Sequence, residues 1–275
     1  MNLKFIEPEN QVLKEILLGY YITEFEEPLN YLIFPNNNII ISSSFNVNIN
    51  YSGSSISINP SKKNDIVSDI ICTYDKPFKI ISKGRYKEIT FVFNPLGFNS
   101  LIKKPLFDLK IGNNEFSPFI LFDDYTKLIL EISNMDNLKT IKEEIEKYWL
   151  SKHIGFKNET LKSIVNEIIQ NPNIEINTLS NKYNISRQYL NRLFKLHFCK
   201  SPSKFKKTQR FRNALKKHAE SKFPKKSLTN LTYESLYYDQ SHLIKDFDYF
   251  SKMSPSTFFK KNNEFEKGLI NWVYS

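Results

Sequence analysis

The first half of the chain alternates hydrophobic and polar residues in short runs, a pattern typical of β-strands with two different faces. The clearest run lies in residues 45–51, where Phe45, Val47, Ile49 and Tyr51 are separated by asparagines. Further runs rich in β-branched or aromatic residues are interrupted by prolines and span residues 29–34, 56–58, 66–73 and 88–93. Short strands with turn signals between them predict an antiparallel β-barrel or sandwich.

Helical spacing begins after this strand-rich region. Residues 125–133 and 137–150 are predicted to be helices, and the second carries an apolar stripe of Leu138, Ile141, Ile145 and Trp149. Such a stripe must be covered, either by the barrel or by a second copy of the chain. We predict a homodimer formed through an N-terminal domain of residues 1–157.

The second domain, residues 158–275, contains an internal repeat. Six residues recur 53 positions further on, namely Leu190, Phe194, Ser201, Pro202, Ser203 and Phe205 as Leu243, Phe247, Ser254, Pro255, Ser256 and Phe258. The sequence of each unit predicts a helix, a tight turn and a second helix. Ser186 is expected to cap a helix over 187–198 and Asp239 a helix beginning at Gln240. The buried face of the first of these helices is expected to hold Tyr189, Leu190, Leu193 and Phe194. The whole chain is therefore predicted to be α+β, with an all-α C-terminal domain.

The positive charge is concentrated in one segment of this domain. The chain has a net charge of +10, and residues 176–226 alone hold 15 basic residues against one acid, Glu220. This segment includes a basic helix predicted over 202–219. A charge of this density favours a polyanionic partner, either nucleic acid or an anionic membrane surface.

The outward-facing polar residues favour DNA. In a helix-turn-helix unit the second helix enters the major groove, where glutamine, asparagine and arginine pair with base edges. The residues expected to contact bases are Gln188, Asn191, Arg192, Gln240, Ser241 and Lys245. Those expected to contact phosphates are Ser186, Arg187, Lys195, Lys204 and Lys207.

Three motifs resemble the AraC/XylS-type transcription regulators. They lie at 185–195, 210–215 and 237–247, and the last is followed by Met253-Ser254-Pro255. The resemblance implies two helix-turn-helix units that read adjacent major grooves of double-stranded DNA. It also implies a cupin-like N-terminal domain for a small-molecule effector or for dimerisation, and RNA polymerase as a further partner. The glycines usual in the two turns are Asn184 and Leu236 here, and an aliphatic residue at positive φ would be strained.

Little in the sequence indicates catalysis. The chain has two cysteines and four histidines, too few and too scattered for a thiolate-rich zinc site or a cupin metal site. We therefore expect no catalytic residues, no metal and no cofactor, and we expect the protein not to be an enzyme. With no apolar run long enough to cross a bilayer, we expect a cytoplasmic protein. The alternatives are an enzyme with a DNA-binding tail and a binder of anionic membranes through helix 202–219.

Overall fold

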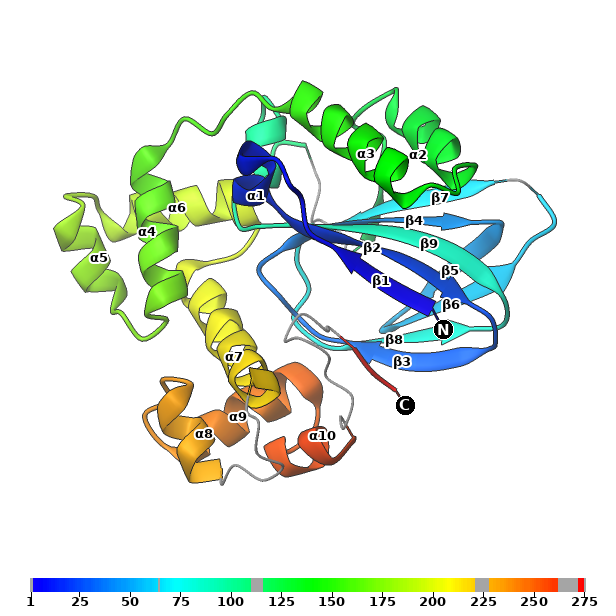
Figure 1. The fold of residues 1–275 in the computed structure, drawn as a ribbon. Coiled ribbons are helices and arrows are strands. Elements are labelled where there is room, and N and C mark those ends of the chain that lie inside the picture. The colour runs from blue at the N-terminus through cyan, green and yellow to red at the C-terminus, as the bar shows by residue number, and fades with distance from the viewer. Residues whose placement is uncertain (1, 64, 110–115, 221–227, 262–271, 275) are drawn as a thin grey trace.

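The structure, a computed structural model, describes residues 2–63, 65–109, 116–220, 228–261 and 272–274. Its N-terminal half is built on two sheets (Figure 1). Sheet A has six strands in the spatial order β1 (Asn2–Ile6), β2 (Leu17–Phe25), β9 (Tyr86–Phe93), β4 (Ile39–Phe45), β7 (Ile66–Ile71) and β10 (Phe116–Pro118). Sheet B has five in the order β11 (Trp272–Tyr274), β3 (Leu29–Ile33), β8 (Phe78–Ser82), β6 (Ser55–Pro60) and β5 (Val47–Ser52).

The predicted antiparallel strand-rich fold is confirmed, with one exception in sheet B. Strand β6 pairs with β8 in parallel, from Ser55 opposite Lys79 to Ile58 opposite Ser82, while the other pairs are antiparallel. Strand β11 was not predicted at all. It pairs with β3, so residues 272–274 lie against sheet B of the N-terminal half.

The two faces of sheet A serve different layers because successive side chains in a strand point to opposite faces. In β9, Ile89, Phe91 and Phe93 join the core beneath the helices. The alternate residues Glu88 and Thr90 face sheet B instead and line a cavity there. The inner faces of the two sheets form a second apolar cluster that includes residues of β3, β6, β7 and β8.

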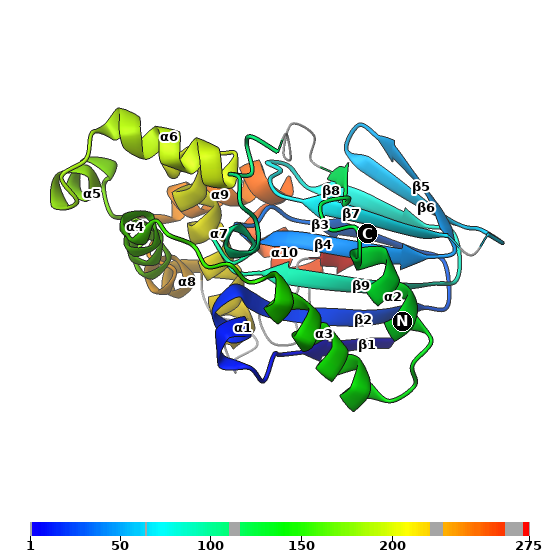
Figure 2. The ribbon, with the colours of Figure 1, turned by 90° about the horizontal axis from the view of Figure 1, so that it is seen from above.

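Helices cover the other face of sheet A, as the view from above shows (Figure 2). They are α1 (Gln11–Ile16), α2 (Tyr125–Ser133) and α3 (Leu138–Lys152), with the short 3-10 helix η1 (Phe98–Leu101) nearby. The predicted α2 and α3 are confirmed. Ile141, Ile145 and Trp149 of the apolar stripe are buried against the sheet, whereas Leu138 is exposed. The stripe is thus covered within one chain and gives no reason for a dimer seam.

Apart from β11, the described residues of the C-terminal half form helices, as predicted. These helices are α4 (Glu159–Gln170), α5 (Ile176–Lys182), α6 (Arg187–Phe198), α7 (Pro202–Glu220), α8 (Leu228–Glu234), α9 (Gln240–Ser251) and α10 (Pro255–Lys261). Helix α7 joins the two units, since Phe205 packs in the core of the first and Phe211 in the core of the second. Its residues Phe205, Phe211, Ala214 and Leu215 are buried. Among the side chains that the structure describes, α7 therefore has no exposed apolar face of the kind that the membrane alternative requires.

A loop of the N-terminal half is docked into this helical half. The loop between β3 and β4 places Phe34 in the core of the second unit, where its ring centroid lies 5.0 Å from that of Phe258. Arg212 of α7 donates hydrogen bonds to the carbonyl oxygens of Phe34 and of Pro35. The buried ammonium of Lys200 donates to the carbonyl oxygen of Asn36 at 3.0 Å. The two halves are therefore joined by specific polar contacts as well as by packing.

Candidate nucleic-acid interface and an interior cavity

The two units have matching local geometry at the start of their second helices. Ser186 caps α6 by accepting a hydrogen bond from the backbone N–H of Tyr189 at 3.1 Å. Asp239 caps α9 in the same way, accepting from the N–H of His242 at 2.8 Å. Both caps were predicted, and each satisfies a backbone donor that the first helical turn leaves without a partner.

The turns before these helices and the ends after them also match. Asn184 and Leu236 have φ angles of 50° and 60°, so both turn positions are left-handed as expected. Cys199 and Lys252, which follow α6 and α9, have φ angles of 55° and 59°. Left-handed residues at the C′ position end helices in a way that glycine usually supports. The repeat in sequence is therefore a repeat in backbone conformation, even where neither copy has a glycine.

The predicted base-contacting residues share one property: all six are exposed. They are Gln188, Asn191 and Arg192 on α6, and Gln240, Ser241 and Lys245 on α9. Tyr189 was predicted to be buried, which is wrong, because it is 38% exposed and its ring lies 5.1 Å from the guanidinium carbon of Arg192. A guanidinium held against an aromatic face is partly fixed in direction before it meets a partner.

Four of the five predicted phosphate-contacting residues are also exposed, namely Ser186, Arg187, Lys195 and Lys207. The fifth differs. The ammonium of Lys204 forms an ion pair with the carboxylate of Asp75, 129 positions away in the N-terminal half. The expectation that Lys204 faces phosphate is not supported by this placement, because its charge is already paired inside the chain.

Several other basic residues of the charged segment are engaged in the interior. Lys200 and Arg210 are buried, and Arg212 donates to two backbone carbonyls. Burial lowers the pKa of Lys200 to about 8. Lys222, Lys225 and Lys226 lie outside the described residues. Among the described residues, the exposed basic side chains of α6 and α7 are Arg187, Arg192 and Lys195 in the first helix and Lys207, Lys216 and Lys217 in the second.

The region around α9 holds a buried polar network rather than a repulsive surface. Arg210 of α7 lies 3.4 Å from Asp246 and 3.1 Å from Nε2 of His242. The side chains of Asp246 and His242 therefore point toward α7, whereas Asp248 is exposed.

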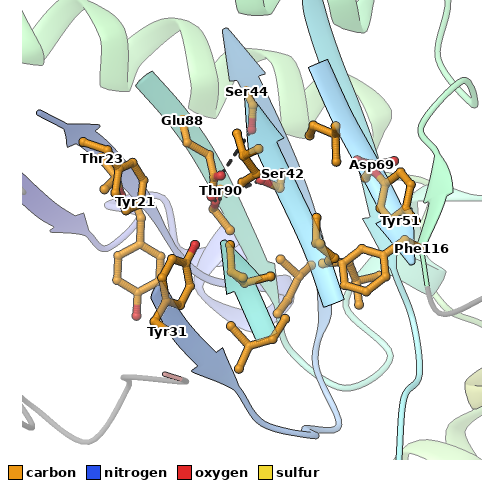
Figure 3. Close-up of a pocket in the computed structure, with 18 of the residues that line it drawn as sticks. Tyr21, Thr23, Tyr31, Ser42, Ser44, Tyr51, Asp69, Glu88, Thr90 and Phe116 are labelled. Carbon is orange, nitrogen blue, oxygen red and sulfur yellow. Dashed lines mark hydrogen bonds between the residues drawn. The ribbon is translucent and has the colours of Figure 1, made fainter. Parts of the chain in front are cut away.

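A cavity of about 120 Å³ lies between the two sheets of the N-terminal half. Its wall is mostly aliphatic and aromatic, and Figure 3 shows Tyr21 and Tyr31 at one side of it. Both carboxylates and several hydroxyl groups come from neighbouring strands of sheet A, and the hydroxyl of Tyr51 comes from β5 of sheet B. The hydroxyl of Thr90 donates to Glu88 at 2.7 Å and that of Ser44 donates to it at 3.2 Å. Tyr51 donates to the carboxylate of Asp69.

This cluster was not identified from the sequence, because only metal ligands and nucleophiles were considered. The available signal was the alternation in β9, where Glu88 and Thr90 are separated by Ile89. Pairing with β4 then places Ser42 opposite Thr90 and Ser44 opposite Glu88. Burial raises the pKa of Glu88, and the charge of Asp69 raises it further, against hydrogen bonds from neighbouring hydroxyls. Burial likewise raises the pKa of Asp69. Among described residues, no group of three or more His, Cys, Asp or Glu side chains could hold a metal ion.

The described helices include none that is long and apolar enough to span a membrane. Comparison with protein families matches residues 179–261 to a helix-turn-helix domain. No curated protein sequence matches the chain.

The fold resembles solved structures of ToxT from Vibrio cholerae. One shares 11% identity and a TM-score of 0.50, over 88% of this chain and 97% of ToxT. Another, of wild-type ToxT bound to an unsaturated fatty acid, shares 11% identity and a TM-score of 0.48, over 92% of this chain and 97% of that one. At 11% identity, the first of these two similarities establishes only the fold.

Proposed function

We infer that this chain, a DNA-binding transcription regulator with an AraC/XylS-type helix-turn-helix domain, reads two adjacent major-groove segments with α6 and α9. The observation that carries this inference is the paired geometry of the units. Each presents a capped second helix with an exposed polar face, and one continuous helix, α7, joins them. A rigid connection fixes the spacing of the two helices, which is what recognition of two grooves on one DNA face requires.

We assign different weights to the two helices. Gln188, Asn191 and Arg192 of α6 have side chains of the types that make two hydrogen bonds to a base edge, although the amide nitrogen of Asn191 already donates to the carbonyl oxygen of Arg187 at 3.0 Å. Lys245 of α9 offers a single flexible charge, and Gln240 is already bonded to Thr229 at 2.7 Å. Arg187, Lys195 and Lys207 would hold the phosphate backbone. The first unit is therefore proposed to contribute more of the base discrimination.

Selection from a random DNA pool tests this function. The full chain should enrich a site with two conserved segments, and the binding constant should fall steeply as salt rises. Replacement of both Asn191 and Arg192 by alanine should abolish enrichment while the helical circular-dichroism signal is unchanged. As a matched control, Asn181→Ala alters an exposed residue of α5, outside the predicted contact set. Equal enrichment by the double variant and the control would contradict the assignment.

We propose further that the cavity of the N-terminal half holds a small-molecule effector. The strands β3 and β4, which supply part of its lining, flank the loop that docks into the helical half. Tyr74 lines the cavity and donates a hydrogen bond to the carbonyl oxygen of Phe34 at 2.5 Å. Arg212 of α7 donates to that same carbonyl. A ligand that displaces Tyr74 would therefore disturb the hold of this loop on α7.

The homodimer stays a prediction. Leu130 of α2 and Leu138 of α3 are exposed apolar residues on the helical layer that covers sheet A. Sedimentation velocity of the full chain at micromolar concentration measures the assembly directly. A monomer throughout that range would contradict the prediction.

A further inference from the structure

The interior cavity has an unusual balance of charge. Two carboxylates from different strands, Glu88 of β9 and Asp69 of β7, line a space whose walls are otherwise apolar or carry only hydroxyl groups. Asp69 is buried and Glu88 is half-buried. None of the lining residues that the structure describes is a lysine, an arginine or a histidine. Both acidic groups therefore face the cavity without a cationic partner from the lining.

The hydrogen bonds these carboxylates receive come from neutral donors. Glu88 accepts from the hydroxyls of Thr90 and Ser44, and Asp69 accepts from Tyr51. Hydroxyl donors reduce the cost of burying a carboxylate, but they do not neutralise its charge. Figure 3 shows Glu88 beside Ser44, Ser42 and Thr90. Tyr21 and Tyr31 lie on one side of this group, and Asp69, Tyr51 and Phe116 lie on the other.

A cation is present near the cavity but is directed elsewhere. Arg212 of α7 is close enough to Tyr21 and Tyr74 for its charge to lower their pKa values, against the larger effect of burial. Its guanidinium donates to the carbonyl oxygens of Phe34 and Pro35. It is not a lining residue, and its contacts hold the docked loop rather than Glu88 or Asp69.

We propose that the cavity binds a small, mainly apolar ligand that carries a protonated amine, with Glu88 as the principal acceptor of the ammonium group and Asp69 as a second negative charge. This inference rests on the proposed effector role of the cavity and adds the chemical class of the ligand. An ammonium group supplies the positive charge that the lining lacks and gains charge-assisted hydrogen bonds. The aromatic rings of the lining, among them Tyr21, Tyr31 and Phe116, can receive the apolar part of the ligand.

The same lining disfavours acids. A ligand carboxylate in this cavity would meet two like charges in an environment of low polarity, where repulsion is strong. The size of the cavity guides the choice of probe. At about 120 Å³ it is close to the ~150 Å³ of a protein cavity known to admit benzene. A single ring with a short amine chain is therefore a suitable probe.

Calorimetry on the full chain without DNA tests the charge preference. The probes are phenethylamine and 3-phenylpropionate, which share a ring and a two-carbon spacer but carry opposite charges. At neutral pH the amine should bind at least about tenfold more tightly than the acid. A hydrogen bond to a charged group contributes more free energy than a tenfold change in affinity requires. Benzylamine and 4-phenylbutylamine extend the test to shorter and longer chains.

Two variants identify the acceptor. Glu88→Gln keeps the shape of the side chain and can still accept the hydrogen bond from Thr90. This variant should lose most of the preference for the amine over the acid. Glu26→Gln is the matched control, because Glu26 is an exposed carboxylate that pairs with Arg85 at 3.2 Å. Its preference should equal that of the unaltered chain. Retained DNA binding by each variant in a gel shift shows that it is folded.

Acid binding equal to or tighter than amine binding would overturn the proposal, and so would the absence of saturable binding of all three amines at millimolar concentration. An unchanged amine preference in Glu88→Gln would overturn the assigned acceptor. Because the calorimetry contains no DNA, none of these results bears on the reading of DNA. Conversely, amine binding that leaves DNA affinity unchanged supports the ligand class and contradicts the effector role.

Discussion

The guanidinium of Arg210 on α7 lies 3.4 Å from the carboxylate of Asp246 on α9, with both side chains at least 90% buried. This ion pair ties the connecting helix to the second recognition helix. Asn173, from the loop before α5, lies 3.5 Å from the same guanidinium and donates to the carbonyl oxygen of Leu236. The first unit, the connecting helix and the turn of the second unit therefore share one polar network.

Removing one partner of this pair should be strongly destabilising. Arg210→Met would leave the Asp246 carboxylate buried without its counter-charge, with an expected loss of ~3–5 kcal/mol in the free energy of unfolding. The control is Arg85→Met, which breaks the exposed pair with Glu26 and should cost ~1 kcal/mol or less. Urea unfolding followed by circular dichroism measures both. Equal losses of unfolding free energy in the two variants would show that the buried pair stabilises the fold no more than the exposed pair does.

The left-handed turn of the second unit should be open to improvement. Leu236 has a φ of 60° and is 39% exposed, so it bears backbone strain while burying only part of its side chain. Leu236→Gly should raise the free energy of unfolding by ~1 kcal/mol, because glycine adopts this conformation without a steric penalty. Asn184→Gly should gain less, since asparagine already tolerates the region. A thermal melt in which Leu236→Gly is the less stable protein would contradict this account.

Local features of the second domain could be predicted from sequence because they depend on neighbouring residues. The caps Ser186 and Asp239 and the left-handed turn at Asn184 are set within a few positions of the chain. The pairing of Lys204 with Asp75 could not be predicted in this way. It joins residues 129 positions apart, and a surface lysine looks the same in sequence whether it meets a phosphate or a carboxylate.

The cavity illustrates the same limit. Strand β4 reads Ile-Ile-Ile-Ser-Ser-Ser-Phe, and its period of two is hidden because each face receives both isoleucine and serine. Ser43 bonds to Tyr125 beneath the helices, while Ser42 and Ser44 face the cavity. Only the register with β9 brings Ser44 to Glu88. The site depends on pairing between strands that are far apart in sequence.

The stability of the chain should depend on pH through Glu88. Because its pKa is raised in the folded state, the folded protein binds this proton more tightly than the unfolded chain. The associated stability is fully present below the ordinary pKa of glutamate, about 4, and is lost as pH rises through the raised value. Glu88→Gln cannot ionise, so it should be more stable than the unaltered chain at pH 7. That difference should shrink as the pH falls toward 4, as measured by urea unfolding at each pH. A gap that stays constant would contradict the assignment.

Two lysines of α7 should behave differently on DNA. Lys207 is exposed, so Lys207→Ala should weaken binding to all sequences and reduce the salt slope by ~1. Lys204 is paired with Asp75, so Lys204→Ala should leave the salt slope unchanged and instead lower the free energy of unfolding. Fluorescence-anisotropy titrations at several salt concentrations separate the two. A larger change of slope in Lys204→Ala would restore it as a phosphate contact.

Alanine substitutions on α6 and on α9 should have different effects on DNA binding. Arg192→Ala is expected to cost ~1–3 kcal/mol in binding and to relax the preference at one base pair. Lys245→Ala should cost less and mainly flatten the salt dependence, because a lysine charge discriminates bases weakly. Both variants are titrated on the same selected site and on single-base-pair variants of it. If Lys245→Ala is the more damaging and the more base-specific, α9 leads recognition and the assigned order of the units is wrong.

The most direct test of two-groove reading is methylation protection of guanines on the selected DNA site. With α6 and α9 in successive major grooves, the full chain should protect two major-groove segments whose centres lie about one helical turn, ~10 base pairs, apart on one face. Arg192→Ala should weaken protection of one segment before the other. Protection of a single segment, or of segments on opposite faces of the duplex, would contradict the account.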